Sequence, residues 1–363
     1  MADNFHTLRL ASVHRIPGDA VAITFDIPPA LSNDFAFKPG QHVAVRAMID
    51  GVEQQRTYSI CTGSNGPLRI GIRHVAGGIF STWAQTHLKA GDTLDVAPPQ
   101  GRFTLPATDG ARRHLLMLAA GAGITPILGM TIEALATAHN TSITLVYGFR
   151  TAASAMFLDE LEDLKDRYPA RFDLIQVLSR PGEAEAELLG GRITGEKLKA
   201  LAANHIDLSH IDLAFLCGPG DVIKQTRNTL FDLGLARDCV HHEFFAGRTG
   251  GATPPLSAAP TPAANSEHAA GGILATAILD GQSHRFLLAP GQHFLDAALA
   301  AGLKPPHSCT AGMCSTCRAR VVEGAVTMTV NYSLEDWEMQ RGFVLTCQAV
   351  AATDTLVVDY DAM

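Results

Sequence analysis

Four cysteines near the C-terminus constrain the fold of this 363-residue chain more than any other feature. Cys309, Cys314, Cys317 and Cys347 follow the spacing C-x4-C-x2-C-x29-C. Three thiolates therefore lie on one tight loop, and the fourth comes from a distant segment. This three-plus-one pattern is the ligand spacing of one class of [2Fe-2S] site, which transfers one electron at a time. The pattern predicts a C-terminal domain folded around the cysteine loop.

Two other interpretations of these cysteines remain open. A structural zinc site usually takes two short C-x2-C pairs, and unrelated buried thiols need no common spacing. The small residues Ala311, Gly312, Ser315 and Thr316 favour the cluster, because they let backbone amides approach the sulfur atoms. The total of seven cysteines is odd, which fits a reduced cytoplasmic protein with a metal site better than a disulfide framework.

Charge and hydropathy exclude several classes of protein. The net charge is −8 and no Lys/Arg cluster occurs, which argues against nucleic-acid binding. The N-terminus has no apolar core of the length that a secretory signal requires. The longest uncharged run, Leu115 to Ile132, contains Gly121, Gly123, Pro126 and Gly129, so it predicts a strand and a helix instead of a membrane span. We therefore expect a cytoplasmic protein with neither a nucleic-acid partner nor a membrane span.

The rhythm of apolar residues divides the chain into three domains and a linker. Short alternating segments between Gly and Pro turns predict an antiparallel β-barrel or sandwich over 1–107. Apolar strands alternating with helical stretches predict an α/β domain with a parallel sheet over 111–245. A Gly/Pro/Ala/Ser/Thr stretch predicts a flexible linker over 246–272, followed by the [2Fe-2S] domain over 273–363. The predicted strands include Val21 to Ile27, Gln41 to Met48, Leu68 to His74, Leu115 to Ala120, Ser142 to Tyr147, Phe172 to Leu178 and Leu213 to Cys217, and Ile273 to Leu288 is expected to form a hairpin.

Two segments of the first domain resemble flavin-binding motifs of the ferredoxin-NADP reductase superfamily. Arg56-Thr57-Tyr58-Ser59 resembles the R-x-Y-S motif of this superfamily. The resemblance implies that Arg56 pairs with the FAD pyrophosphate, that Tyr58 stacks on the isoalloxazine, and that the Ser59 hydroxyl reaches flavin N5, which receives hydride. The segment Arg73 to Ser81 resembles a second flavin motif, in which Gly and Ser amides cradle phosphate oxygens. Its candidate residues are Arg73, His74, Gly77, Gly78 and Ser81; the alternative for both arginines is a solvated strand face.

The second domain carries candidate nicotinamide motifs. The turn Gly121-Ala122-Gly123 and the helix start Ile124-Thr125-Pro126 follow a predicted strand, so backbone amides can bind a pyrophosphate there. Proline is well placed in a first helical turn. Farther on, Cys217-Gly218-Pro219 resembles the family's C-G-P segment beside the nicotinamide ring; the alternative for Cys217 is an ordinary core position.

The choice of nicotinamide cofactor depends on recognition of the adenosine 2'-phosphate. Ser179-Arg180 follows the predicted strand Phe172 to Leu178, where NADPH-using relatives often carry Ser-Arg. A guanidinium and a hydroxyl suit this dianion better than a carboxylate does. We therefore expect NADPH in preference to NADH. Arg150 is a further candidate for the pyrophosphate or adenine end, or it is an exposed surface arginine.

Together these motifs resemble the reductases in which a flavin and nicotinamide module is fused to a C-terminal plant-type ferredoxin of the β-grasp fold. The likeness extends to the reductase subunits of bacterial phenylacetyl-CoA epoxidases, through segments such as Val326 to Tyr332. It implies transfer from NADPH through FAD and a [2Fe-2S] cluster to an oxygenase of phenylacetate degradation, with Tyr58, Ser59 and Cys217 at the site of hydride transfer.

The identity of the partner leaves other functions open. Related reductases serve Rieske-type hydroxylases such as ketosteroid 9α-hydroxylase. A stand-alone oxidase or redox sensor, and a zinc-stabilised binding protein, are alternatives of another class. The segment 273–363 has five basic and nine acidic residues, a net charge of −4. This charge would steer the segment toward a basic patch on an oxygenase; the alternative is that the acidic residues merely solvate the surface.

Overall fold

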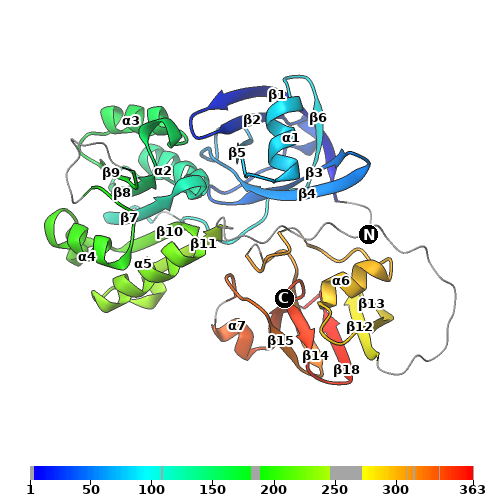
Figure 1. Ribbon diagram of the computed structural model, residues 1–363. Helices are drawn as coiled ribbons and strands as arrows, with labels where there is room; N and C mark the ends of the chain where they lie inside the picture. Colours follow the sequence, from blue (N-terminus) through cyan, green and yellow to red (C-terminus); the bar gives the residue numbers. More distant parts are fainter. Residues whose placement is uncertain are drawn as a thin grey trace. The chain divides into compact units, whose positions relative to one another are not determined.

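The computed structural model describes residues 4–107, 109–180, 189–245, 272–307, 309–313, 315–334 and 336–362. The chain forms two compact units, which divide between Arg248 and Thr249 (Figure 1). The predicted linker, 246–272, lies outside the described residues except for Gly272, and so does the cluster candidate Cys314. Each unit is described separately below.

The first unit begins with an antiparallel sheet of six strands in the order β4-β3-β6-β1-β2-β5. Its two edges meet, because Ile60, directly after β4, forms an antiparallel bridge with Ile70 of β5. The sheet is thus closed into a barrel, and buried aliphatic residues alternate along its strands toward one core. Helix α1 packs against β4 and β5. The elements are β1 (His6–Ile16), β2 (Ala20–Asp26), η1 (Pro29–Leu31), β3 (His42–Ile49), β4 (Val52–Ser59), β5 (Arg69–Arg73), α1 (Ile79–His87) and β6 (Thr93–Val96).

The same unit continues with a parallel sheet of five strands in the order β11-β10-β7-β8-β9. Helices lie over both faces, with α2 packed on β7, β8 and β10, and α5 packed on β10 and β11 (Figure 1). The strands are rich in Leu, Ile and Val because such a sheet is buried on both sides. The elements are β7 (Arg113–Ala120), η2 (Gly121–Gly123), α2 (Ile124–Thr137), β8 (Thr141–Phe149), η3 (Ala152–Ser154), α3 (Leu158–Arg167), β9 (Phe172–Leu178), α4 (Gly195–Asn204), η4 (Leu208–His210), β10 (Leu213–Pro219), α5 (Gly220–Asp232), η5 (Arg237–Cys239) and β11 (Val240–Phe245).

The second unit is a mixed sheet with strand order β13-β12-β18-β14-β16. The first and last strands, β12 and β18, pair in parallel at its centre, and α6 packs on β13. This is the β-grasp arrangement expected for the C-terminal domain. The elements are β12 (Ile273–Leu279), β13 (Gln282–Leu288), α6 (Phe294–Ala300), β14 (Arg318–Glu323), β15 (Val326–Met328), α7 (Asp336–Gln340), β16 (Phe343–Leu345), β17 (Ala349–Ala351) and β18 (Thr355–Asp359).

The three expected architectures are confirmed, and most strands lie within two residues of their predicted bounds. The uncharged run Leu115 to Ile132 divides as expected into a strand that ends at Ala120 and a helix that begins at Ile124. The R-T-Y-S motif forms the last four residues of β4. Among the described helices, we find none that is long and apolar enough to cross a membrane.

Candidate functional site

The parallel sheet reverses its strand order between β7 and β10, and the carboxyl ends of these strands meet there. Ligands of open α/β sheets bind in the crevice outside such a switch point. A Cβ on Gly123 would lie only 2.2 Å from the Cys217 carbonyl oxygen and 2.8 Å from the Gly218 nitrogen. The two chain segments therefore touch backbone to backbone, as only glycine permits. Gly121 has φ +58° and begins the turn that leads into α2.

The first turn of α2 has the features of an anion site. Thr125 is buried and its Oγ1 donates to the carbonyl of Ala122 at 3.0 Å, so the hydroxyl stabilises the turn. Pro126 occupies the third helical position, where its missing N–H costs nothing. No side chain caps the helix start at Gly123. The first amides of α2 and its dipole are thus directed at the crevice, where a pyrophosphate would bind.

Cys217 is completely buried near the end of β10. Burial raises the pKa of its thiol well above the usual value, and the neighbouring Glu243 carboxylate raises it further. The thiol is therefore neutral at physiological pH. In this state it can pack against an aromatic ring and exclude water, but it is no nucleophile.

The flavin candidates of β4 lie on a strand that pairs with β3. Tyr58 pairs in register with Val43, and its ring lies 5.9 Å from that of Phe80 on α1. Burial raises the pKa of the Tyr58 hydroxyl, while the Arg56 charge lowers it. The ring is therefore a neutral aromatic platform. Ser59 is buried, and Thr57 pairs with Ala44. The Arg56 guanidinium lies along its own strand and donates to the Gln55 carbonyl at 2.6 Å.

The second flavin segment forms the turn between β5 and α1. Gly77 has φ +76°, and a Cβ there would meet nothing within 4 Å, so the backbone is open on that side. The Ser81 hydroxyl accepts from the Val75 amide at 3.1 Å and donates to the Gly78 carbonyl at 3.3 Å. Gly78 precedes α1, and no side chain caps that helix. His74 contacts Thr82 on the first turns of α1 at 3.3 Å. The turn can therefore present amides to a phosphate.

Arg73 connects this segment to the nucleotide crevice. Its Nη1 lies 2.7 Å from the position that a Cβ on Gly121 would occupy. A side chain on Gly121 would displace the guanidinium. Two motifs that lie far apart in the sequence, the second flavin segment and the glycine turn, are thus brought together.

The candidates for the 2'-phosphate lie at the carboxyl ends of β8 and β9. The Ser179 amide donates to the Phe149 carbonyl at 2.8 Å, and the Arg180 amide donates to the Arg150 carbonyl at 3.0 Å. Arg150 and Arg180 are both exposed. The parallel sheet therefore places Arg150, Ser179 and Arg180 side by side, although they come from different segments. Residues 181–188, which follow them, lie outside the described part of the chain.

Two residues that no sequence motif indicated, Glu243 and His42, lie near this end of β10. Glu243 pairs in register with Cys217 across β10 and β11. His42 begins β3, pairs with Ser59, and holds its Nδ1 3.9 Å from Glu243 Oε1. Burial lowers the pKa of His42 to about 4, so its ring is neutral at pH 7. The sequence feature that could have indicated Glu243 is that it is the one acidic residue in the aromatic strand Val240–Phe245.

The cysteine loop of the second unit fits thiolate ligands. The backbone amides of Ala311 and Met313 both donate to the Cys309 sulfur at 3.4 Å. Thr310, Gly312 and Ser315 have positive φ values, which curl the loop around this sulfur. Two amide donors on one sulfur stabilise a thiolate and help to set a cluster potential.

Cys317 and Cys347 lie in one small buried cluster, with Leu295, Leu334, Phe343 and Leu345. Thr346 joins their segments, because its amide and its hydroxyl each donate to the Cys317 carbonyl at 3.1 Å. Within the described ranges, no three His, Cys, Asp or Glu side chains gather in a metal-holding arrangement. Cys309, Cys317 and Cys347 are thus placed by one loop and one buried cluster, and they are the described part of the four-cysteine set.

Comparisons with known proteins identify the three domains. A model of the oxidoreductase FAD-binding domain matches residues 7–105, and a model of the oxidoreductase NAD-binding domain matches residues 117–228. A model of the 2Fe-2S iron-sulfur cluster binding domain matches residues 277–352. The chain therefore has FAD-binding, NAD-binding and [2Fe-2S] domains in the expected order.

Similar proteins share this organisation along their whole length. One subunit of the 1,2-phenylacetyl-CoA epoxidase from Escherichia coli (strain K12) is 39% identical, with 99% of this chain and 98% of the relative covered. The ferredoxin reductase component of 3-ketosteroid-9-alpha-monooxygenase from Rhodococcus rhodochrous is 31% identical, with 97% and 96% covered. The solved structure of phthalate dioxygenase reductase has the same fold, with a TM-score of 0.59, 21% identity and 98% of both chains covered. The chain belongs to the family of electron-transfer reductases that join FAD-binding, NAD-binding and [2Fe-2S] domains in one polypeptide.

Proposed function

We propose that this chain takes hydride from NADPH onto FAD and passes single electrons through a [2Fe-2S] cluster to the oxygenase component of a phenylacetyl-CoA epoxidase. The proposal rests on the match between this chain and a component of such an epoxidase along almost the whole length of both. The barrel with R-T-Y-S, the glycine crevice and the cysteine loop occur in one chain, which matches a component of such an epoxidase over 99% of its length. A two-electron donor and a one-electron acceptor site are thus joined in one polypeptide.

The residues of the chain have separate tasks in this proposal. Bound FAD supplies hydride acceptance and one-electron release, and a bound [2Fe-2S] cluster supplies one-electron transfer. Tyr58 offers a neutral ring and Ser59 a hydroxyl on the barrel side. On the sheet side, the amides after Gly121 bind pyrophosphate and the neutral Cys217 thiol excludes water from the nicotinamide. Hydride transfer requires no general acid or base here.

The further cofactor residues follow the same division. We propose that Arg56, Arg73 and the turn from His74 to Ser81 bind the FAD pyrophosphate and that Thr57 keeps β4 in register. On the nicotinamide side, Gly123, Thr125, Pro126, Gly218 and Pro219 shape the crevice. The four cysteines Cys309, Cys314, Cys317 and Cys347 hold the cluster.

The preference for NADPH is supported by the positions of Arg150, Ser179 and Arg180. The backbone places these three residues side by side at the ends of β8 and β9, where the adenosine half of a nucleotide bound at the crevice would extend. Arg can bind a phosphate through two parallel hydrogen bonds. A carboxylate in this position would instead repel the 2'-phosphate.

A Rieske-type hydroxylase is the second candidate partner. It is favoured by the 31% identity with the ferredoxin reductase component of the ketosteroid monooxygenase. Both candidates require the same internal electron path. Assays with the purified epoxidase oxygenase and with a Rieske-type oxygenase distinguish them.

The internal path is tested by Cys347→Ser in the full chain, with Cys239→Ser as the matched control. Cys239 lies in η5 of the first unit and is not one of the four candidate cluster ligands. Ferricyanide takes electrons from the flavin directly, whereas cytochrome c and the oxygenase depend on the cluster. We expect Cys347→Ser to keep NADPH oxidation with ferricyanide within about twofold and to lose about tenfold or more with cytochrome c, since a missing ligand destroys the site.

Cofactor analysis provides the complementary measurement. The unaltered protein should contain FAD, and two irons with two acid-labile sulfides in each chain, as a [2Fe-2S] cluster requires. Zinc in place of iron would support the zinc-stabilised alternative. Full oxygenase turnover by Cys347→Ser would show that the cluster is not on the path and would refute the proposal.

A further inference from the structure

Strand β5 carries the sequence Arg-Ile-Gly-Ile-Arg, and its two faces have different partners. Successive side chains of a strand point to opposite faces. Ile70 and Ile72 are fully buried in the core of the barrel. Arg69, Gly71 and Arg73 therefore share the opposite face. Their contacts show that this face meets elements of the NAD-binding domain.

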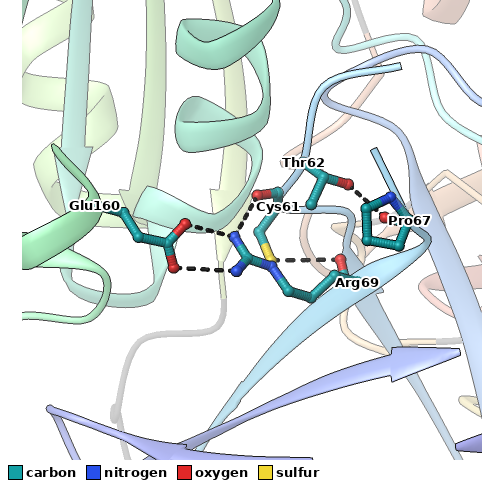
Figure 2. Close-up of polar contacts among 5 residues, drawn as sticks. All are labelled: Cys61, Thr62, Pro67, Arg69 and Glu160. Atoms are coloured by element: carbon teal, nitrogen blue, oxygen red, sulfur yellow. Dashed lines mark hydrogen bonds and ion pairs between the residues drawn. The ribbon is translucent and has the colours of Figure 1, made fainter. Parts of the chain in front are cut away.

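Arg69 binds the start of helix α3 (Figure 2). Its Nη1 donates to Glu160 Oε1 at 3.1 Å, and its Nη2 donates to Glu160 Oε2 at 2.7 Å. Nη2 also donates to the Cys61 carbonyl at 3.2 Å, while the Cys61 thiol donates to the Arg69 carbonyl at 3.3 Å. The guanidinium lies 5.2 Å from the centre of the Phe157 ring. This bidentate pair joins two domains and keeps a defined geometry.

Gly71 allows the close approach of the same helix start. A Cβ on Gly71 would lie 3.0 Å from Phe157 Cε2 and 3.1 Å from Met156 Cε. Phe157 directly precedes α3 and has φ +57°, which turns its ring onto the strand. A side chain at position 71 would therefore force the Phe157 ring and the end of the Met156 side chain to shift.

Arg73, at the end of the same face, reaches the nucleotide crevice beside Gly121. The fully buried Tyr147 contacts both the segment before α3 and the glycine turn. Its hydroxyl lies 3.2 Å from the Met156 carbonyl and 3.5 Å from the Gly121 carbonyl. The Arg73 charge lowers the pKa of this hydroxyl, although burial raises it overall. These contacts together connect the start of α3, β5 and the glycine turn.

From these contacts we infer that Arg69 and Glu160 form a positioning pair for hydride transfer. The pair fixes β5 against α3, and β5 in turn fixes Arg73 and the following flavin segment against the crevice between β7 and β10. Neither residue touches the reacting atoms. The inference rests on the proposed function, because it assigns a role in the transfer between nicotinamide and flavin.

The test is anaerobic stopped-flow reduction of the flavin by NADPH in the full-length, FAD-loaded protein. Glu160→Gln removes the charge but keeps the shape of a side chain that is 40% exposed. Asp95→Asn is the matched control: Asp95 pairs with Arg46 at 3.2 Å and is 36% exposed, but both residues belong to the barrel. We expect the rate constant of flavin reduction to fall about tenfold or more in Glu160→Gln, because sub-ångström misplacement is costly in such transfers. The control should stay within about twofold.

Three further measurements separate positioning from a purely structural role. The dissociation constant for NADP+ should change less than about twofold in Glu160→Gln, since the nucleotide-binding residues are intact. Amide hydrogen exchange at Gly121–Gly123 should increase, although this turn lies away from Glu160. The double variant Arg69→Met/Glu160→Gln should lose no more than Glu160→Gln alone, because the two residues act as one unit. Glu160→Asp, which keeps the charge on a shorter side chain, should show an intermediate rate and serves if Glu160→Gln binds FAD poorly.

The outcomes distinguish the inference from the proposed function. If NADPH leaves the flavin of the unaltered protein oxidised, the proposed function is wrong. If the unaltered protein is reduced and both Glu160 variants match its rate constant within about twofold, the positioning role is wrong. A lower melting temperature with an unchanged rate constant likewise overturns the inference. The inference is also wrong if the two substitutions lower the rate constant of flavin reduction independently, so that their effects multiply in the double variant.

Discussion

Replacing Gly123 with alanine tests the backbone contact that forms the nucleotide crevice. Gly123 has φ −61° and ψ −7°, which alanine adopts without strain. Gly→Ala in such a conformation would by itself stabilise the fold by about 0.4 to 1 kcal/mol, because the unfolded chain loses freedom. Any loss of stability therefore comes from steric collision alone.

The size of the collision follows from the contacts. The new Cβ would lie 2.2 Å from the Cys217 oxygen and 2.5 Å from its carbonyl carbon, where at least 3.0 Å is needed. These are backbone atoms of β10, which is held by its pairing with β7 and β11. The crevice must open by about 0.8 Å, and overpacking of this kind typically costs 1 to 3 kcal/mol. Since the backbone atoms cannot rotate away, we expect a cost near the upper end, about 3 kcal/mol, which leaves a net loss of about 2 to 2.6 kcal/mol after the gain of about 0.4 to 1 kcal/mol is subtracted.

Calorimetry and stopped-flow reduction measure the two consequences. For a unit of this size the loss corresponds to a melting temperature lower by about 4 to 10 °C. Displacement of Cys217 by most of an ångström should slow flavin reduction by about 10- to 100-fold. Gly272→Ala is the control, because its Cβ would meet only the flexible Leu287 side chain at 3.4 Å. Unchanged stability and rate in Gly123→Ala would refute the close contact between the glycine turn and β10.

Three further predictions address charges. Unfolded His42 binds a proton near pH 6.5, whereas the buried ring binds one only near pH 4. As the pH falls between these values, His42 therefore lowers the unfolding free energy by up to about 1.4 kcal/mol per pH unit. Urea unfolding of His42→Gln should show a shallower dependence of the unfolding free energy on pH, and an equal dependence contradicts the assignment. Arg180→Ala should raise KM for NADPH about tenfold or more and leave KM for NADH nearly unchanged, whereas similar KM values for both cofactors in the unaltered enzyme would contradict the preference. The Glu338 side chain is 0% exposed and lies 2.8 Å from Arg318, which is 22% exposed. Glu338→Ala should therefore destabilise the [2Fe-2S] unit by about 1.5 to 3 kcal/mol, measured as a lower calorimetric transition. The exposed Glu196→Gln is the control, and equal effects of both would refute the role of burial.

The sequence alone determined the features that depend on neighbouring residues. Strand and helix periodicity is local, so Phe172–Leu178 is a strand with the predicted bounds. The division of the run from Leu115 to Ile132 follows from its glycines and proline, which end a strand and begin a helix. The spacing of the four cysteines is likewise a local pattern for three of them, and it predicted the [2Fe-2S] domain that the family comparison identifies.

Only the tertiary structure decided which distant residues meet. Arg69 and Glu160 are 91 residues apart, and nothing in either local sequence indicates a partner. His42 and Glu243 come from the two domains of the first unit, so their approach depends on how barrel and sheet pack. Cys217 has a recognisable motif, but its neutral thiol results from complete burial. Desolvation and contacts across domains arise from packing of the whole chain, which residue patterns along one segment do not encode.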